Sequence, residues 1–252
     1  MTGRPASNPA RISFLGAQSY AHRGLHGDTG RPENSLPAFA AALDGGYGME
    51  CDVRLSADGV PFVFHDATFD RLTRATGAFA ERKAAEIDRI TLTGGGGPVP
   101  RLAALLDLIG GRAPLLIELK IDRHREIRPL CEAVRRALAH YRGPVAIMSF
   151  HPGVARWFHA HAPHIVRGLV VTEENRHGPL GRLARHLALC AAHPDFLAYD
   201  IRDLPSSFVR ARRHRDMPVL SWTVRTPQQW RTVEAEADAA IFERTGMMRG
   251  ED

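Results

Sequence analysis

Met49-Glu50-Cys51-Asp52-Val53-Arg54-Leu55-Ser56-Ala57-Asp58-Gly59-Val60-Pro61-Phe62-Val63-Phe64-His65 is the stretch that decides the fold. Two apolar runs, residues 49–55 and 60–65, are separated by four residues that include Asp58-Gly59, a strong signal for a hairpin turn. A parallel connection needs a dozen or more residues, so the second run must be antiparallel to the first. The stretch therefore predicts a strand that carries a hairpin arm.

The turn also predicts which side chains share a face of this hairpin. With Asp58-Gly59 as a two-residue turn, Ala57 lies opposite Val60, and His65 lies opposite Asp52. Glu50 shares the face of Asp52 because strand periodicity is two. The other face is then apolar and holds Cys51, Val53, Phe62 and Phe64.

Outward from the hairpin, short apolar runs alternate with amphipathic stretches, which is typical of repeated βα units. The predicted strands are residues 19–22, 49–55, 60–65, 114–119, 145–150, 166–171, 196–199, 219–224 and 239–242. The predicted helices are residues 35–43, 102–109, 126–139, 152–160, 180–190, 206–212 and 227–237.

Removal of the antiparallel arm leaves eight parallel strands. The prediction is an α/β fold, a single (β/α)₈ TIM barrel with a β-hairpin arm after strand 2 and a loop excursion over residues 66–100. A chain of 252 residues has the size of one such barrel. We expect residues 1–16 to form a flexible N-terminal tail and residues 17–252 to form one domain.

Composition indicates an ordinary globular protein, with 44% hydrophobic and 24% charged residues. No apolar run approaches the roughly 18 residues of a membrane span, and the N-terminus has no apolar segment typical of a secretory signal. Three widely spaced cysteines, Cys51, Cys131 and Cys190, do not suggest a disulfide framework. We therefore expect a cytoplasmic protein without stable membrane insertion.

A formal charge of +5 raises the question of nucleic-acid binding. The basic runs at residues 135–136 and 210–215 fall in predicted helices and are not interleaved with the aromatic residues of a stacking surface. No zinc-finger or helix-turn-helix spacing accompanies them. We interpret them as solvated helix faces and expect no nucleic-acid partner.

Three carboxylates indicate a metal site. Glu50 and Asp52 share a strand face, and Glu118 ends the strand at residues 114–119, where catalytic groups gather in such barrels. Carboxylates at close range repel unless one is protonated or a cation lies between them. An all-oxygen set favours Mg²⁺, or alternatively Ca²⁺, over Zn²⁺.

Cations and histidines accompany these carboxylates at predicted strand ends. Arg23 and Lys120 beside a metal favour a polyanionic ligand such as phosphate. His22 and His65 can serve as general base and general acid. Each cluster alone has an ordinary structural explanation. Pro32-Glu33-Asn34-Ser35 is chiefly a helix start with Asn34 or Ser35 as the capping residue, and a position of Glu33 near the mouth of the site is the second interpretation. The conjunction of the clusters is what indicates a catalytic site.

The same conjunction resembles the glycerophosphodiester phosphodiesterases of the phosphatidylinositol-phospholipase-C-like barrel group, over residues 20–242. The matching motifs are Ala21-His22-Arg23-Gly24, Pro32-Glu33-Asn34-Ser35 with Ala38-Phe39, Met49-Glu50-Cys51-Asp52-Val53, Asp58-Gly59 through His65-Asp66, Arg71-Leu72-Thr73, Pro100-Arg101-Leu102, Ile117-Glu118-Leu119-Lys120, Ser149-Phe150 and Trp222-Thr223-Val224.

The resemblance implies a role for each matching position. The implied acid/base pair is His22 and His65, and the implied phosphate contacts are Arg23 and Lys120. The implied metal ligands are Glu50, Asp52 and Glu118, and the implied pocket wall is Phe150 and Trp222. Two differences stand out: a polar, glycine-containing segment at residues 26–31, and Ile241-Phe242-Glu243-Arg244 where the family usually has Ile-Thr-Asp.

The expected function is metal-dependent hydrolysis of a small-molecule glycerophosphodiester to sn-glycerol 3-phosphate and an alcohol, within lipid and glycerol metabolism. The alternatives are a lysophospholipase D-like phosphodiesterase and a non-catalytic binding protein on the same scaffold. The sequence leaves open the head group, the choice of Mg²⁺ or Ca²⁺, which histidine is the acid, whether water or a substrate hydroxyl attacks, and the oligomeric state.

Overall fold

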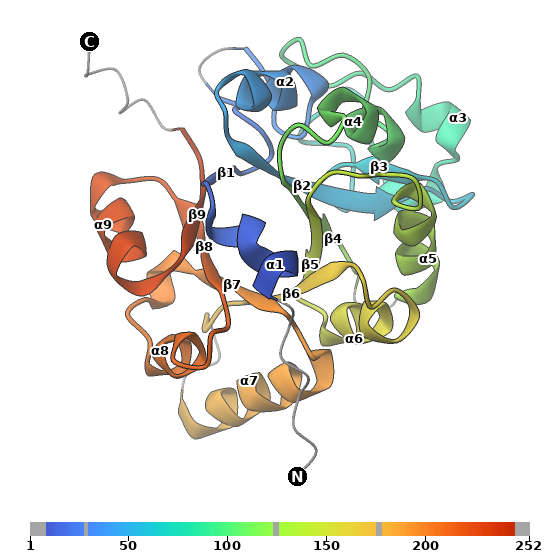
Figure 1. Cartoon of the computed structure of the whole chain (residues 1–252). Coiled ribbons are helices and arrows are strands. Elements are labelled where there is room, and N and C mark those ends of the chain that lie inside the picture. Colours follow the sequence, from blue (N-terminus) through green and yellow to red (C-terminus); the bar gives the residue numbers. More distant parts are fainter. Residues whose placement is uncertain (1–8, 28–29, 123–125, 175–177, 245–252) are drawn as a thin grey trace, which may run out of the picture.

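Eight parallel strands close into a barrel in the computed structural model of the chain, which describes residues 9–27, 30–122, 126–174 and 178–244 (Figure 1). The barrel strands are β1 (Tyr20–Ala21), β2 (Gly48–Leu55), β4 (Leu115–Leu119), β5 (Val145–Ser149), β6 (Val166–Val171), β7 (Phe196–Asp200), β8 (Val219–Val224) and β9 (Ala239–Phe242). Because β1 pairs with both β2 and β9, the ring of eight parallel strands is closed. The predicted (β/α)₈ barrel is confirmed.

Helices cover the outside of this barrel (Figure 1). They are α2 (Leu36–Asp44), α4 (Leu102–Ile109), α5 (Arg128–Ala137), α6 (Pro152–His161), α7 (Gly178–Ala192), α8 (Ser207–Arg213) and α9 (Pro227–Glu236). Thr226 and Gln229 form a reciprocal capping box at the start of α9, which fixes where that helix begins. None of the described helices is both long enough and apolar enough to span a bilayer.

The N-terminal segment corrects one expectation. Residues 9–16 were expected to belong to a flexible tail, but they form α1 (Pro9–Ile12) and the 3₁₀ helix η1 (Ser13–Gly16). Figure 1 shows α1 lying across the near end of the barrel. Leu15 is fully buried there in a cluster with Leu116 and Leu220 from inside the barrel. This segment closes one end of the barrel core, and residues 1–8 lie outside the described residues.

The hairpin arm is confirmed, but its predicted register is wrong by one residue. Strand β3 (Pro61–Val63) is antiparallel to β2, with Val53 opposite Val63. The loop has three residues, because the N–H of Ser56 donates to the carbonyl of Val60. Gly59 adopts φ of 84°, as expected for a three-residue loop that ends in a left-handed residue.

This one-residue shift places every side chain of β3 on the face opposite to the predicted one. Val63, rather than Phe62 or Phe64, joins Cys51 and Val53 in the main core. Phe62 and Phe64 pack instead against aromatic side chains of the excursion at residues 66–100. That excursion therefore has an apolar core of its own and also contains η2 (Phe79–Glu81) and the short helix α3 (Ala84–Ile87).

Candidate active site

Three carboxylates converge at the carboxyl ends of β2 and β4. Asp52 and Glu118 are register partners on these neighbouring strands, and Glu50 lies two residues earlier on β2. One carboxylate oxygen from each residue lies within 4.8 Å of the other two. All three side chains are buried. The structure thus brings these three predicted residues together, because strand pairing and the two-residue periodicity place them on one face.

Burial and mutual repulsion separate the pKa values of these groups. Burial raises the pKa of Glu50 well above its ordinary value, and the charges of Asp52 and Glu118 raise it further. Burial also raises the pKa of Glu118, against the opposing effect of Lys120. For Asp52, Lys120 and Arg23 outweigh burial and hold the pKa well below its usual range. A cation at this cluster would favour the ionised form of every carboxylate.

The chain neutralises this cluster only in part. The Lys120 ammonium lies 2.7 Å from Glu118 Oε1 and 3.0 Å from Asp52 Oδ1, and Arg23 Nε lies 3.0 Å from Asp52 Oδ2. Glu50 Oε1 is buried and has no hydrogen-bond partner among the described residues. A buried acceptor without a partner is costly, and three oxygen donors this close fit a hard divalent cation.

Asn34 is a site residue that the sequence analysis missed. It was assigned to a helix start, where Ser35 does cap α2 by accepting from the Ala38 N–H. Asn34 itself is fully buried, and its Nδ2 donates to Asp52 Oδ2 at 2.9 Å. Its Oδ1 accepts from the backbone N–H of Asp52 at 3.2 Å. This double contact orients the Asp52 carboxylate.

The turn after β1 places Arg23 against the same cluster. Arg23 has φ of 55°, and its backbone N–H donates to Glu50 Oε2 at 3.1 Å. A Cβ at Gly24 would lie 2.8 Å from the carbonyl carbon of Ala38, so only glycine fits this close approach. The Arg23 guanidinium also bonds Glu33 Oε1 at 2.7 Å.

His22 lies beside this turn and is almost buried. Its Nδ1 lies 2.7 Å from Glu243 Oε1, and its Nε2 lies 3.9 Å from Glu50 Oε2. Arg225 in turn holds Glu243 at 2.7 Å. Burial lowers the pKa of His22, although the hydrogen bond with Glu243 opposes this shift. His22, Glu243 and Arg225 therefore form a continuous line of polar contacts.

His65 has a similar environment on the other side of the carboxylates. Its Nδ1 lies 2.6 Å from Asp66 Oδ1, and Arg71 holds Asp66 Oδ2 at 2.6 Å. Burial lowers the pKa of His65, and Asp52 opposes this shift. The predicted pairing of His65 opposite Asp52 is wrong, because Phe64 bonds the Asp52 carbonyl instead. His65 follows the end of β3, where strand alternation no longer applies.

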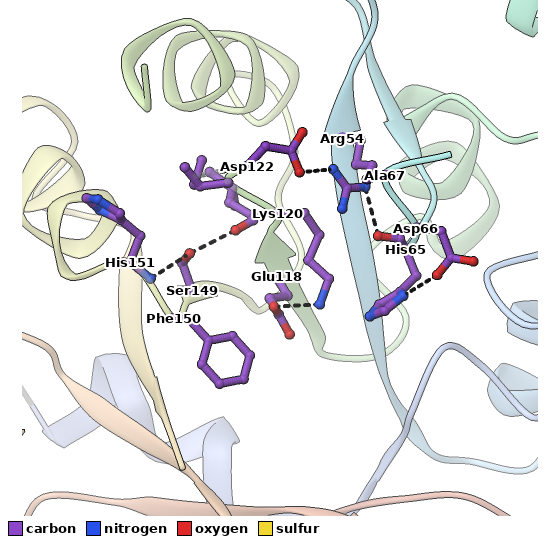
Figure 2. Close-up of a pocket in the computed structure, with 12 residues that line it drawn as sticks. Arg54, His65, Asp66, Ala67, Glu118, Lys120, Asp122, Ser149, Phe150 and His151 are labelled. Carbon is purple, nitrogen blue, oxygen red and sulfur yellow. Dashed lines mark hydrogen bonds and ion pairs between the residues drawn. The ribbon is translucent and has the colours of Figure 1, made fainter. Parts of the chain in front are cut away.

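Both histidines line one cavity of about 430 Å³, which they share with Arg23, Glu118, Lys120, Phe150 and Trp222. A second cavity of about 650 Å³ adjoins it and shares His65, Glu118, Lys120 and Phe150. Figure 2 shows the side chains of this second cavity, with the Lys120–Glu118 contact at its centre and the Arg54–Asp122 ion pair on its far side. Phe150 packs edge-to-face on Trp222, with ring centroids 5.5 Å apart.

The structure thus gathers every candidate residue at one end of the barrel and adds several that sequence analysis did not assign. Glu33 was considered for the mouth of the site, and Glu243 was noted as a difference from the family pattern. Arg71 and Arg225 had no assigned role. The difference at Glu243 was the one sequence signal that pointed to a partner for His22. β9 nevertheless closes the barrel, because the His22 N–H donates to the Phe242 carbonyl.

Comparison with known sequences finds a matching family model and several similar proteins. The chain matches the model of the Glycerophosphoryl diester phosphodiesterase family over residues 22–247. It is 31% identical over 156 residues to a glycerophosphodiester phosphodiesterase of Bacillus altitudinis, a match that covers 58% of this chain and 63% of that protein. A Caldanaerobacter subterraneus enzyme of the same name is 31% identical over 160 residues, covering 60% and 65% of the two chains. The matches thus span slightly less than two thirds of these relatives.

Solved structures with the same fold cover nearly the whole chain. A phosphodiesterase of Oleispira antarctica, solved with the product sn-glycerol-3-phosphate, superposes with a TM-score of 0.80 at 24% identity, covering 92% of this chain and 94% of that one. A glycerophosphoryl diester phosphodiesterase of Silicibacter pomeroyi, named as putative, gives a TM-score of 0.78 at 25% identity, covering 92% and 93%.

Proposed function

Because the chain belongs to the glycerophosphoryl diester phosphodiesterase family, we propose that it hydrolyses glycerophosphodiesters to sn-glycerol 3-phosphate and an alcohol. The observation that carries this proposal is the cavity that His22 and His65 share with Glu118 and Lys120. A phosphodiester bound there meets two proton-transfer groups and a cluster of carboxylates. The product named for the Oleispira antarctica structure is the product we expect.

Glu50, Asp52 and Glu118 would hold a divalent cation, Mg²⁺ or alternatively Ca²⁺. When bound, this cation would polarise a phosphoryl oxygen and lower the pKa of the attacking group. Asn34 holds the Asp52 carboxylate in one orientation through its two hydrogen bonds. Arg23 and Lys120 lie beside the cluster, where their positive charge favours a phosphate group.

His22 and His65 carry the protons in this proposal. One imidazole accepts a proton from the nucleophile, which is water or a glycerol hydroxyl of the substrate, and the other donates a proton to the departing alkoxide as its P–O bond breaks. If the glycerol hydroxyl attacks, the product is a cyclic phosphate, which water then opens to sn-glycerol 3-phosphate. In each histidine Nδ1 faces a carboxylate, Glu243 or Asp66. This contact favours the tautomer that leaves Nε2 available for the reaction. Phe150 and Trp222 form an apolar wall of the same cavity.

The test measures release of sn-glycerol 3-phosphate from a panel of glycerophosphodiesters, with Mg²⁺, with Ca²⁺ and with chelator. We expect chelation to abolish turnover, and Glu50→Gln, Asp52→Asn and Glu118→Gln each to do the same. Lysophosphatidylcholine belongs in the panel, since preferential release of choline from it would favour the lysophospholipase D-like alternative. Full activity in excess chelator would contradict the proposed metal site.

A further inference from the structure

Helix α7 exposes an apolar stripe on the outside of the barrel. Leu180, Leu183 and Leu187 are 81%, 55% and 61% exposed. Among the described residues, the one other exposed large hydrophobic side chain is Phe150, at 46%, and it lines the candidate catalytic cavity. Cys190 is also exposed. Residues 180, 183, 187 and 190 recur at helical spacing and therefore share one face.

The opposite face of α7 explains the orientation of this stripe. Gly181, Arg185 and Ala192 are buried toward the barrel. Arg185 is held there by Glu173, at 3.0 Å. The helix therefore packs on the barrel through this inner face. The leucines lie on its outer face and point toward solvent. Leucines this exposed indicate a contact that the isolated chain does not supply.

The charge around the stripe is positive. Helices α6, α7 and α8 are adjacent in Figure 1 and contain six arginines and no aspartate or glutamate. Three of these arginines, Arg185, Arg210 and Arg213, form ion pairs with carboxylates outside the three helices. On α8, Arg212 contacts His186 of α7 at 3.0 Å. Arg156 of α6 and Arg182 of α7 are exposed, and neither forms an ion pair with another described residue. The leucines are thus set in a basic surface.

This charge pattern selects between two occupants of the stripe. A second copy of the chain, packed through the same face, would bring two basic surfaces together without opposing carboxylates on these helices. An anionic lipid surface offers what both features need: phosphates for the arginines and an acyl boundary for the leucines.

We propose that the face formed by Leu180, Leu183, Leu187 and Cys190, together with Arg182 on the same helix and Arg156 on the neighbouring helix α6, docks the enzyme peripherally on anionic lipid bilayers. The apolar stripe enters the boundary between head groups and acyl chains, and the barrel stays in water. The surface is separate from the catalytic cavity, so the inference does not depend on the proposed activity.

The experiment is co-sedimentation of the full chain with vesicles of phosphatidylcholine alone and of phosphatidylcholine mixed with phosphatidylglycerol. We expect binding to the anionic vesicles, weak binding to the neutral ones, and release at about 1 M salt, where charges further apart than roughly 3 Å are screened. The double variant Leu183→Ser/Leu187→Ser should lose binding at least tenfold. Arg156→Gln/Arg182→Gln should lose roughly tenfold or more.

A matched control removes two exposed arginines from another face. Arg135→Gln/Arg136→Gln on α5 changes the net charge by the same amount and should leave vesicle binding close to wild type. Circular dichroism checks that each variant is folded. Equal binding of the leucine variant and the wild type, or absence of wild-type binding to anionic vesicles, overturns the proposal. A dimer in light scattering that the leucine variant dissociates would assign the stripe to a second copy, which also overturns it.

Discussion

The His22 and His65 regions have the same chemical plan in different surroundings. Each imidazole contacts a carboxylate through Nδ1, and each carboxylate is held by an arginine. Only 12% of the His22 side chain is exposed, against 31% for His65. The plan repeats even though one region is built from β1 and the end of β9, and the other from the segment that follows the hairpin arm.

The difference lies in what the arginines do next. Arg71 bonds Asp66 and also Glu33, with contacts of 2.7 and 2.9 Å to the Glu33 oxygens. Glu33 in turn holds Arg23, which lies against Asp52 of the carboxylate cluster. The His65 region is therefore connected to Asp52 through the ion pairs of Arg71, Glu33 and Arg23. Arg225 instead bonds Glu243, the carboxylate that contacts His22, and Nε2 of His22 lies 3.9 Å from Glu50. Because the His22 and His65 regions contain the same residue types but differ in their ion-pair connections, we expect equivalent mutations in the two regions to change activity by different amounts.

The largest effect should come from removing either imidazole. We expect His22→Ala and His65→Ala each to lower kcat by about 10² or more, the usual scale for one proton-transfer partner. Both variants should fold, because the two residues lie at the open end of the barrel. The measurement is kcat for one glycerophosphodiester, with circular dichroism as the folding check.

His186→Ala is the control for this comparison. His186 is exposed on α7, far along the chain from either candidate, and contacts Arg212. Its loss should leave kcat near wild type. If His186→Ala were as damaging as His65→Ala, the assignment of the catalytic pair would be wrong.

The second prediction concerns Lys120, which lies between the two regions and lines both cavities. Lys83 and Lys120 are the two lysines among 33 lysines and arginines, so an arginine would be the ordinary cation in this chain. The Lys120 ammonium fits between Asp52 and Glu118, at 3.0 and 2.7 Å. A wide planar guanidinium does not replace a compact ammonium there.

We therefore expect Lys120→Arg to lower kcat/KM nearly as much as Lys120→Ala. Lys83→Arg is the matched control and should be silent, because Lys83 is exposed in the excursion. Near-wild-type activity of Lys120→Arg would mean that any cation suffices at this position, and the argument from its size would fail.

The fold could be predicted because the number of residues between two strands determines whether the strands can be parallel. Four residues between two apolar runs allow only an antiparallel arm. Without that arm eight predicted strands remain, which is the number of strands in a (β/α)₈ barrel. The register failed because Asp58-Gly59 fits both a two-residue and a three-residue loop, and the choice depends on hydrogen bonds of Ser56 and Val60. The N-terminal helix was missed because four residues of α1 carry too little periodicity to be recognised.

The site was predictable where function required a residue type at a strand end. Glu50, Asp52 and Glu118 follow from periodicity and strand order. Asn34 was not predictable in this way, because it does not lie on a strand. Its side chain bonds Asp52, which is 18 positions away in the sequence, and only the folded chain brings the two together. Its sequence context supports a helix start equally well.

The third prediction uses pH to separate the two histidines. Glu243 favours the protonated form of His22, and Asp66 favours that of His65. Glu243→Gln therefore lowers the pKa of His22 further, and Asp66→Asn lowers that of His65. If one histidine is the base and the other the acid, one variant should shift the acid limb of the kcat/KM profile and the other the alkaline limb, both toward lower pH.

This experiment also assigns the roles that the sequence left open. The variant that moves the acid limb identifies the general base, because the base must be unprotonated to act. Both variants should keep a bell-shaped profile, with kcat lowered less than in the alanine variants of the histidines. A shift of the same limb by both variants would show that the two histidines do not divide acid and base between them.

The smallest effects should come from the two arginines, and they test the difference between the regions directly. Arg71 and Arg225 are similarly exposed, at 49% and 47% of the side chain. Exposed ion pairs contribute up to about 1 kcal/mol, so Arg225→Gln should lower kcat/KM by no more than roughly fivefold. Arg71→Gln releases both Asp66 and Glu33 and should cost more, on the order of tenfold, with weaker binding of the activating metal. Titration of activity with the metal separates the two variants. If both variants changed the metal concentration needed for half-maximal activity by the same factor, the ion pairs that link Arg71 through Glu33 and Arg23 to Asp52 would not affect function.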